Sequence, residues 1–217
     1  MSEQNRENIL NRLRGIQSTL QEQQSGELTQ GIEEIIKPAL QTPQLLDLLL
    51  ENMTSVQISV TNISTWNEVG HAVYHYVEQH NLAHDVTIAP ALRTLKWPSS
   101  LNVTSGIADG DTRVTVTPCL AAVAETGSLV FASDPHHPTS LLFLPEHHLV
   151  VVSQKQIIPH LEDIWPLLDR YARQPRVINF NTGPSRTADI EQTMELGAHG
   201  PRAMHVILVA EARSLSG

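Results

Sequence analysis

The stretch His205-Val-Ile-Leu-Val-Ala210, HVILVA, decides the fold class, because it is apolar on both faces of an extended strand. Strands of this kind are typical of the centre of a parallel sheet that is covered on both sides. Outward from this stretch, short apolar segments alternate with helical patterns along most of the chain. Strands are expected at 56–61, 86–89, 101–104, 113–117, 129–132, 149–153, 177–180 and 204–210, and helices at 66–80 and 159–172. The alternation predicts an open, mainly parallel α/β sheet with helices on both faces.

The chain before this alternation is predicted to contain two further helices. Apolar residues between Ile9 and Leu20 follow helical spacing and indicate an amphipathic helix. The polar, glycine-containing stretch 21–31 is typical of a connector. A helix is then expected from Thr42-Pro43 to Asn52, because proline is favoured in a first helical turn. We therefore divide the chain into an N-terminal helix with its connector, residues 1–30, and an α/β domain, residues 31–217.

Length, charge and cysteine content limit the classes of function. The 217 residues suffice for one ordinary domain. The 14 basic and 23 acidic residues give a formal charge of −9 without a basic cluster, which argues against a nucleic-acid partner. No apolar run approaches the roughly 20 residues of a membrane span and the polar start is unlike a signal peptide, so a cytoplasmic protein is expected. The single cysteine, Cys119, excludes an internal disulfide and a zinc or Fe–S site built from this chain's cysteines alone.

The segment 179–191, NFNTGPSRTADIE, has the pattern of a ligand-binding loop. It follows a predicted strand and turns at Gly183-Pro184. It is then predicted to enter a helix that is capped by Ser185 or Thr187 and carries Asp189 in its first turn.

Such a helix start favours an anion. Its backbone N–H groups, the two hydroxyls and the Arg186 guanidinium could together hold a phosphate or a carboxylate. The alternative is a capped turn in which Arg186 pairs with Asp189, and the residue types alone do not separate the two. The segment matches neither a P-loop nor a dinucleotide-binding turn.

A second candidate is Ala124-Glu-Thr-Gly-Ser128, which lies between two apolar runs. An acid in this setting is expected to be partly buried, and burial would raise the pKa of Glu125 and suit it to proton transfer or nucleophilic attack. Gly127 would let a ligand approach closely. The alternative, which the spacing favours, is a surface turn between two strands with Glu125 as a solvated acid.

Histidines supply further candidates. His199 lies in the turn 197–201 before the last strand, where it could donate to an anion or move a proton near neutral pH, although a lone histidine in a turn is more often structural. The pairs His136-His137 and His147-His148 match no recognised zinc spacing, so no metal site is assigned and their roles stay open.

Four segments together resemble the LUD-domain family: AETGS at 124–128, Pro145-x-x-His148-Leu-Val, TGPSRTADIE at 182–191 and GAHGPRAMHVIL at 197–208. The likeness runs from about Val56 to the C-terminus. It implies the fold of ribose-5-phosphate isomerase and the CoA transferases, which agrees with the strand pattern. The family's shared residues, carried onto this chain, are Glu125, Thr126, Gly127, Ser128, His148, Gly183, Pro184, Ser185, Arg186, Thr187, Asp189, Glu191, His199, Gly200 and Pro201.

The resemblance also implies a function. Members of the family are similar in role to a subunit of the bacterial system that oxidises L-lactate to pyruvate, in which two partner proteins carry the Fe–S clusters. This chain would take a structural, substrate-binding or docking part, with no cofactor of its own. We expect a small hydroxy or keto acid, or another small anion, at the carboxyl edge of the sheet. There the loops around 125, 186 and 199 would converge, with Arg186 gripping the carboxylate and with Glu125 and His199 exchanging a proton.

Two other functions stay open. A stand-alone isomerase or CoA-transferase-type enzyme would use Glu125 as base or nucleophile. The pattern at 125–127 is similar to the Glu-Asn-Gly of family I CoA transferases, but Thr126 replaces the asparagine. A non-catalytic assembly or regulatory subunit would instead use the N-terminal helix to dock on a partner. The sequence does not decide whether the chain forms a homo-oligomer.

Overall fold

Six parallel strands form the central sheet of the protein. The computed structural model describes residues 42–169, 174–188, 194–197 and 199–211. The strand order is β1 (Ile58–Ile63), β12 (Ala203–Val209), β7 (His147–Ser153), β4 (Val114–Pro118), β2 (Asp85–Ile88) and β3 (Asn102–Ser105), and every neighbouring pair is parallel. The stretch HVILVA lies in β12, an interior strand that is buried along nearly its whole length. The predicted parallel α/β sheet is therefore confirmed.

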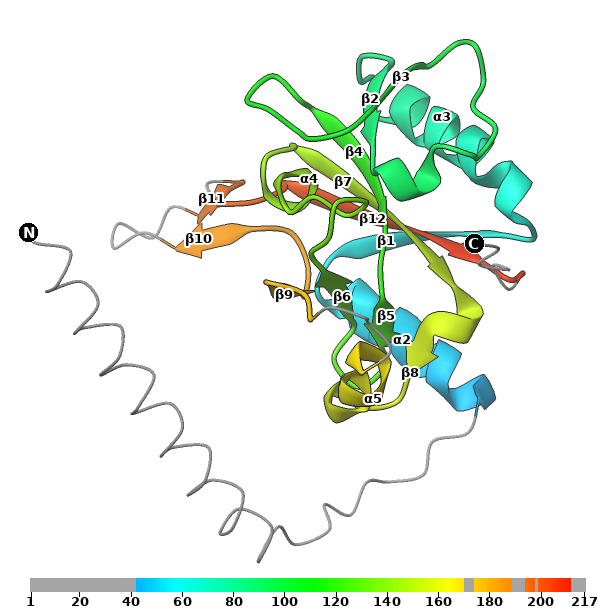
Figure 1. The fold of residues 1–217 in the computed structure, drawn as a ribbon, viewed down its shortest axis with the longest axis vertical. Coiled ribbons are helices and arrows are strands. Elements are labelled where there is room, and N and C mark those ends of the chain that lie inside the picture. The colour runs from blue at the N-terminus through cyan, green and yellow to red at the C-terminus, as the bar shows by residue number, and fades with distance from the viewer. Residues whose placement is uncertain (1–41, 170–173, 189–193, 198, 212–217) are drawn as a thin grey trace, which may run out of the picture. The chain divides into compact units, whose positions relative to one another are not determined.

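Alternate residues of the interior strands pack into two separate cores. On one face, Leu149 and Ile207 pack with α3 (Val69–Gln79), which follows the short 3-10 helix η1 (Trp66–Glu68). On the other face, Val150 and Val206 pack with α2 (Thr42–Ser55). Helices thus cover both faces of the sheet, as predicted (Figure 1).

A second sheet of four strands shares the α2 face. Its order is β8 (Ile157–Ile158), β5 (Ala121–Val123), β6 (Ser128–Ala132) and β9 (Ile178–Asn181). Leu129 and Phe131 of β6 pack with the central sheet, whereas Val130 and Ala132 pack on the opposite side with α5 (Trp165–Leu168). Both faces of this small sheet are therefore buried, which explains why its apolar runs lack a polar alternation.

Short elements complete the described chain. They are the 3-10 helices η2 (Pro90–Leu92), η3 (Gln154–Gln156) and η4 (Leu161–Ile164), and the one-turn helix α4 (Ser140–Phe143). The helix expected over 159–172 is the pair η4 and α5, which ends earlier, at Leu168. The predicted N-terminal helix lies outside the described residues.

The helix predicted to begin at Ser185 or Thr187 is wrong. Residues Arg186–Ala188 form strand β10, which pairs antiparallel with β11 (Met194–Leu196). The extended course is set one residue earlier, because the backbone of Ser185 already bonds to two other chain segments. Its N–H donates to Pro201 O at 2.8 Å, and its carbonyl accepts from Gly197 N at 3.1 Å. In a helix capped by Ser185 this carbonyl would accept the first bond within the helix, whereas here it accepts from Gly197 N.

Candidate functional site

The loops around 186 and 199 meet directly at the amino end of the sheet, and the turn around 125 is bonded to the first of them. The Ser185 bonds to Pro201 and Gly197 join the loop after β9 to the loop that leads into β12. Because β12 begins at Ala203, and Gly183 lies against Val56 just before β1, this junction lies where the parallel strands start. The expected position at the carboxyl edge is therefore corrected to the amino end.

Glycines in the candidate loops make room for the protein's own backbone. Gly127 has φ +69°, and a Cβ there would lie 2.9 Å from the backbone carbon of Asn52 in α2. Gly183 has φ +99°, and its Cβ would lie 2.5 Å from Val56 O. Only glycine fits both the left-handed conformation and the contact. The space beside Gly127 that was expected to admit a ligand is filled by α2.

A chain of hydroxyl groups links the AETGS turn to the loop after β9. Thr126 Oγ1 donates to Ser128 Oγ at 2.7 Å, and Ser128 Oγ lies 2.6 Å from Thr182 Oγ1. Ser128 is buried, so its hydroxyl needs such partners. These bonds fix the turn between β5 and β6 against the segment that carries Gly183-Pro184.

Glu125 belongs to the same turn but is held by a different element. Its Oε2 lies 2.7 Å from His160 Nδ1, and its Oε1 accepts from Leu161 N at 2.7 Å, at the start of η4. The hydrogen bond from His160 lowers the pKa of Glu125 and outweighs the opposing effect of burial. The raised pKa considered for this acid is thus not found, and the surface turn between two strands is what the structure shows.

The loop junction carries two arginines and the histidine of the predicted site. Arg186, His199 and Arg202 are all exposed. Arg202 runs along the junction, since a Cβ on Gly197 would lie 2.2 Å from its Cγ. Thr187 belongs to β10, and Asp189 lies outside the described residues.

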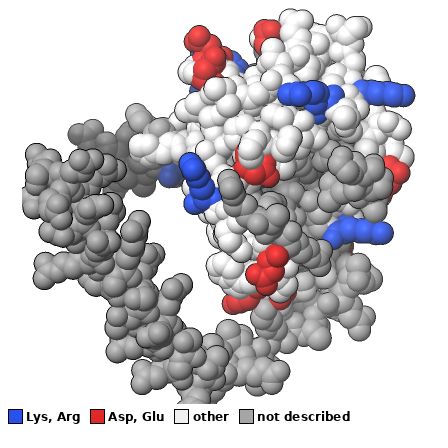
Figure 2. All heavy atoms as spheres, viewed as in Figure 1, with Lys and Arg blue, Asp and Glu red and all other residues white. Residues whose placement is uncertain are grey.

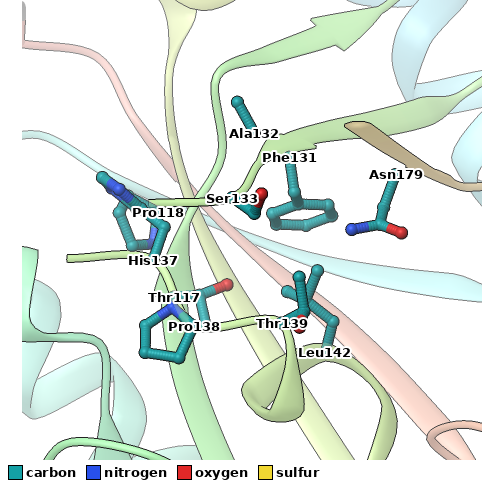
Figure 3. A pocket seen from close by; sticks show the side chains of 10 residues that line it. All are labelled: Thr117, Pro118, Phe131, Ala132, Ser133, His137, Pro138, Thr139, Leu142 and Asn179. Atoms are coloured by element: carbon teal, nitrogen blue, oxygen red, sulfur yellow. The ribbon is translucent and has the colours of Figure 1, made fainter. Parts of the chain in front are cut away.

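A pocket lies elsewhere, between the two sheets. It is partly open to solvent and small, with a volume of about 10 Å³, which suffices for about one water molecule. Its lining consists of Thr117 and Pro118 of β4, Phe131 and Ala132 of β6, Asn179 of β9, Leu142 of α4 and the loop residues Ser133, His137, Pro138 and Thr139 (Figure 3). The surface that lines it is mainly apolar, and no Lys or Arg is among the lining residues. His137 is the one lining residue that can carry a positive charge, and its Nδ1 lies 2.9 Å from both oxygens of Asp134.

Two buried polar atoms at this pocket have no hydrogen-bond partner among the described residues. They are Asn179 Nδ2 and His148 Nδ1, the latter on β7 directly behind the pocket, where its Nε2 lies 2.8 Å from Thr117 Oγ1. Each such atom costs about 1–3 kcal/mol when left unsatisfied. Full burial lowers the pKa of His148 to about 3, so the ring is neutral. Buried polar groups without partners are a recognised mark of functional sites.

The sequence reasoning missed Asn179 and Thr117 as candidates. Asn179 stands at the head of the quoted segment NFNTG, and it alternates with Ile178 and Phe180 in a short strand. A polar residue at an inward-facing position of a strand is the signal that could have identified Asn179. No comparable signal marks Thr117, because threonine is common in strands.

Metal ligands do not gather in the described part of the chain. No three His, Cys, Asp or Glu side chains lie close enough together there to hold a metal ion. On the face seen in Figure 2, Lys and Arg side chains are scattered among acidic and uncharged ones. None of the helices in residues 42–211 that the structure describes combines the length and the apolar character needed to cross a membrane.

The fold and the pocket together define an open-sheet α/β protein with a small, mainly apolar pocket between its two sheets. A match to the LUD domain covers residues 46–209, so the chain belongs to the LUD-domain family and the resemblance seen in the sequence is confirmed. The chain is 30% identical to lactate utilization protein C of Geobacillus thermodenitrificans (strain NG80-2) over 134 residues, which are 60% of this chain and 56% of that protein. It is 32% identical to lactate utilization protein C of Halalkalibacterium halodurans over 91 residues, 40% of each chain.

A solved structure shares the fold. A DUF162 family protein from Deinococcus radiodurans superposes with a TM-score of 0.62 at 20% identity, and the match covers 79% of this chain and 100% of that one. At this identity the likeness establishes the fold alone. The alignments span only about 40% to 56% of the length of the two curated relatives.

Proposed function

We propose that this chain is a cytoplasmic component of a system that oxidises L-lactate to pyruvate, and that it binds a small hydroxy or keto acid or another small anion. Membership of the LUD-domain family and the names of the relatives support the pathway. The family resemblance suggests proteins with Fe–S clusters as its partners. The single cysteine of this chain is itself far from the four ligands that such a cluster usually needs.

The loop junction is the observation that best supports the proposed anion site. The Ser185 bonds join the two loops that carry Arg186 and Arg202 at the amino end of β12, and both arginines and His199 are exposed. A guanidinium group binds a carboxylate through two parallel hydrogen bonds, and two such groups favour an anion over a neutral ligand. Ser185 and Thr187 would add hydroxyl donors. Charge and side-chain donors thus replace the helix start that the sequence led us to expect.

Isothermal titration tests this site. We expect L-lactate, pyruvate or ribose 5-phosphate to bind the wild-type chain, and Arg186→Ala to weaken binding by about tenfold or more, since a charge-assisted pair contributes about 1.5–3 kcal/mol. Arg93→Ala is the matched control, because Arg93 is equally exposed but follows η2, outside the junction. Absence of binding to the wild type, or equal binding by the Arg186 variant, removes the anion site.

Growth tests the pathway separately. A strain that lacks this gene is expected to grow poorly with L-lactate as its carbon source and normally with pyruvate. Normal growth on L-lactate would remove the pathway assignment while leaving the titration result untouched.

The contacts of Glu125 favour an anchoring role over a nucleophilic one. Both carboxylate oxygens already have partners, His160 and Leu161 N, so attack on an acyl-CoA would break two hydrogen bonds. The test of the enzymatic alternative is to incubate the protein with acyl-CoA and hydroxylamine. We expect no hydroxamate at Glu125, and its appearance would favour a CoA-transferase-type enzyme.

A further inference from the structure

We infer that an acid-sensitive contact holds the last turn of α3 on the central sheet, and that uptake of protons releases this turn. The contact is made by four side chains, which we call the Tyr76 cluster. They are Tyr76 in α3, His80 at the C-terminal cap of α3, His147 at the start of β7 and His205 in β12. The inference does not depend on the proposed role in lactate oxidation.

The ring of Tyr76 joins three histidines from three segments. It stacks on the ring of His80 at a centroid distance of 4.0 Å, and its centroid lies 4.7 Å from that of His205. The Tyr76 hydroxyl group lies 3.0 Å from His147 Nδ1. Tyr76 is only 4% exposed and His205 only 6%, so a positive charge on the buried imidazole would be poorly hydrated.

The hydrogen-bond partners of the three imidazoles are neutral. His80 Nδ1 donates to the carbonyl oxygen of Tyr76 at 2.9 Å. His205 Nδ1 lies 2.7 Å from Ser59 Oγ of β1, the strand beside β12. Since His147 bonds to the Tyr76 hydroxyl, no carboxylate is bonded to any of the three among the residues that the structure describes.

The charges around the cluster also oppose uptake of a proton. Burial lowers the pKa of His147, and the charge of His80 adds to this shift. Glu146 raises the same pKa, but its carboxylate is already paired with Arg113, and Arg202 lowers the pKa further. The one described acid that acts on His147 is thus engaged elsewhere.

Release of the turn would remove this obstacle to protonation. While α3 covers the ring, burial lowers the pKa of His205 to about 4, with His80 adding to the shift. Once uncovered, the ring should titrate near 6.5. Each pH unit below about 6.5 then favours the released form by up to about tenfold for this histidine, and His147 adds to the effect. Residues 78–81 are all exposed, so few other contacts hold the turn.

Amide hydrogen exchange at about pH 7 and about pH 5 tests the release, with protection factors that correct for the intrinsic pH dependence of exchange. The amide to follow is that of Leu82, which donates to Val77 O at 3.0 Å and closes the end of α3. Val56 is the matched reference, because its amide donates to Asn52 O at the end of α2, on the opposite face of the sheet. We expect the protection of Leu82 to fall about tenfold or more relative to that of Val56.

Two variants separate the cluster from other buried histidines. His205→Asn keeps a partner for Ser59 but cannot take up a proton, so it should make the fall in Leu82 protection at least about threefold smaller. His148→Asn is the matched control, since His148 is also buried but lies on the other face of β7, against Thr117. In this control the Leu82 amide should respond to pH as it does in the wild type.

The wild-type chain gives a second readout that needs no variant. In carbon-13 spectra the ring of His205 should still be neutral at about pH 6, where a histidine of ordinary pKa is mostly protonated. The inference is overturned if Leu82 keeps its protection relative to Val56 down to about pH 5, or if His205→Asn leaves the loss of protection unchanged. It is also overturned if His205 titrates near 6.5 while Leu82 stays protected.

Discussion

Gly127 shows how one backbone conformation fixes the AETGS turn. It adopts φ +69°, and a Cβ would lie 2.9 Å from the backbone of Asn52 and 3.0 Å from that of Met53. Gly127→Ala should therefore lower the free energy of unfolding by roughly 1–3 kcal/mol, from strain in the left-handed region together with the contact on α2. Urea unfolding followed by circular dichroism measures the change.

Gly110 provides the control for this substitution. A Cβ there meets no atom within 4 Å. Gly110→Ala should change the free energy of unfolding by no more than about 0.5 kcal/mol. An equal loss in both variants would show that the contact between Gly127 and α2 does not constrain the turn.

Single residues also show which features of the structure could be predicted from the sequence. The Glu125 turn could be predicted, because two apolar runs flank it. The partner of Glu125 could not, because His160 is 35 positions away and only the pairing of β5 with β8 brings it near. Burial alone would raise the pKa of this acid, but the hydrogen bond from His160 decides the direction. A flanking sequence predicts burial better than it predicts partners.

At the scale of elements, the strands β7 and β12 each hold a buried neutral histidine. Burial lowers the pKa of His148 to about 3 and that of His205 to about 4, with His80 adding to the shift of His205. In the unfolded chain both titrate near 6.5. As the pH falls below about 6.5 the unfolded chain binds protons that the folded chain does not, so stability is lost over the range from 6.5 down to the folded pKa values.

The expected loss is about 1.4 kcal/mol per pH unit for each of these histidines within that range. His205→Asn should reduce the slope of the free energy of unfolding against pH by about the contribution of one histidine. The amide can still hydrogen-bond to Ser59 Oγ, which lies 2.7 Å from His205 Nδ1. His71→Asn, an exposed position on α3, is the control. Denaturant unfolding between about pH 7 and pH 5 tests this, and an unchanged slope in the His205 variant would contradict it.

The elements themselves were predicted unevenly. Strands of the central sheet could be predicted, because burial on both faces leaves a continuous apolar run in the sequence. The segment 185–188 could not, because Ser and Thr suit a helix cap as well as an extended strand. Its extended course depends on bonds from Ser185 to Pro201 and Gly197, more than ten positions along the chain. Local propensity could not anticipate these contacts.

At the scale of the whole molecule, the order of the strands decided where the loops meet. The prediction placed all three loops at the carboxyl edge, where loops that follow parallel strands lie, although the turn at 197–201 was itself expected before the last strand. That turn does precede β12, and the loop after β9 leaves a different sheet. Parallel topology was predictable from the alternation of elements. The assignment of β5, β6, β8 and β9 to a second sheet was not, because it depends on pairing between distant segments.

The α/β domain and residues 1–30 are expected to have separate roles, the first in stability and the second in binding a partner. Residues 40–217 form a compact unit of their own, so a chain that lacks residues 1–30 should unfold with the wild-type free energy to within about 0.5 kcal/mol. If the predicted amphipathic helix docks in a partner's groove, the same truncation should abolish capture of the Fe–S proteins from cells grown on L-lactate. Iron content of the captured fraction, with the full chain alongside, is the measurement. Equal iron with both chains would move the docking surface onto the α/β domain, where the loop junction would be the first region to mutate.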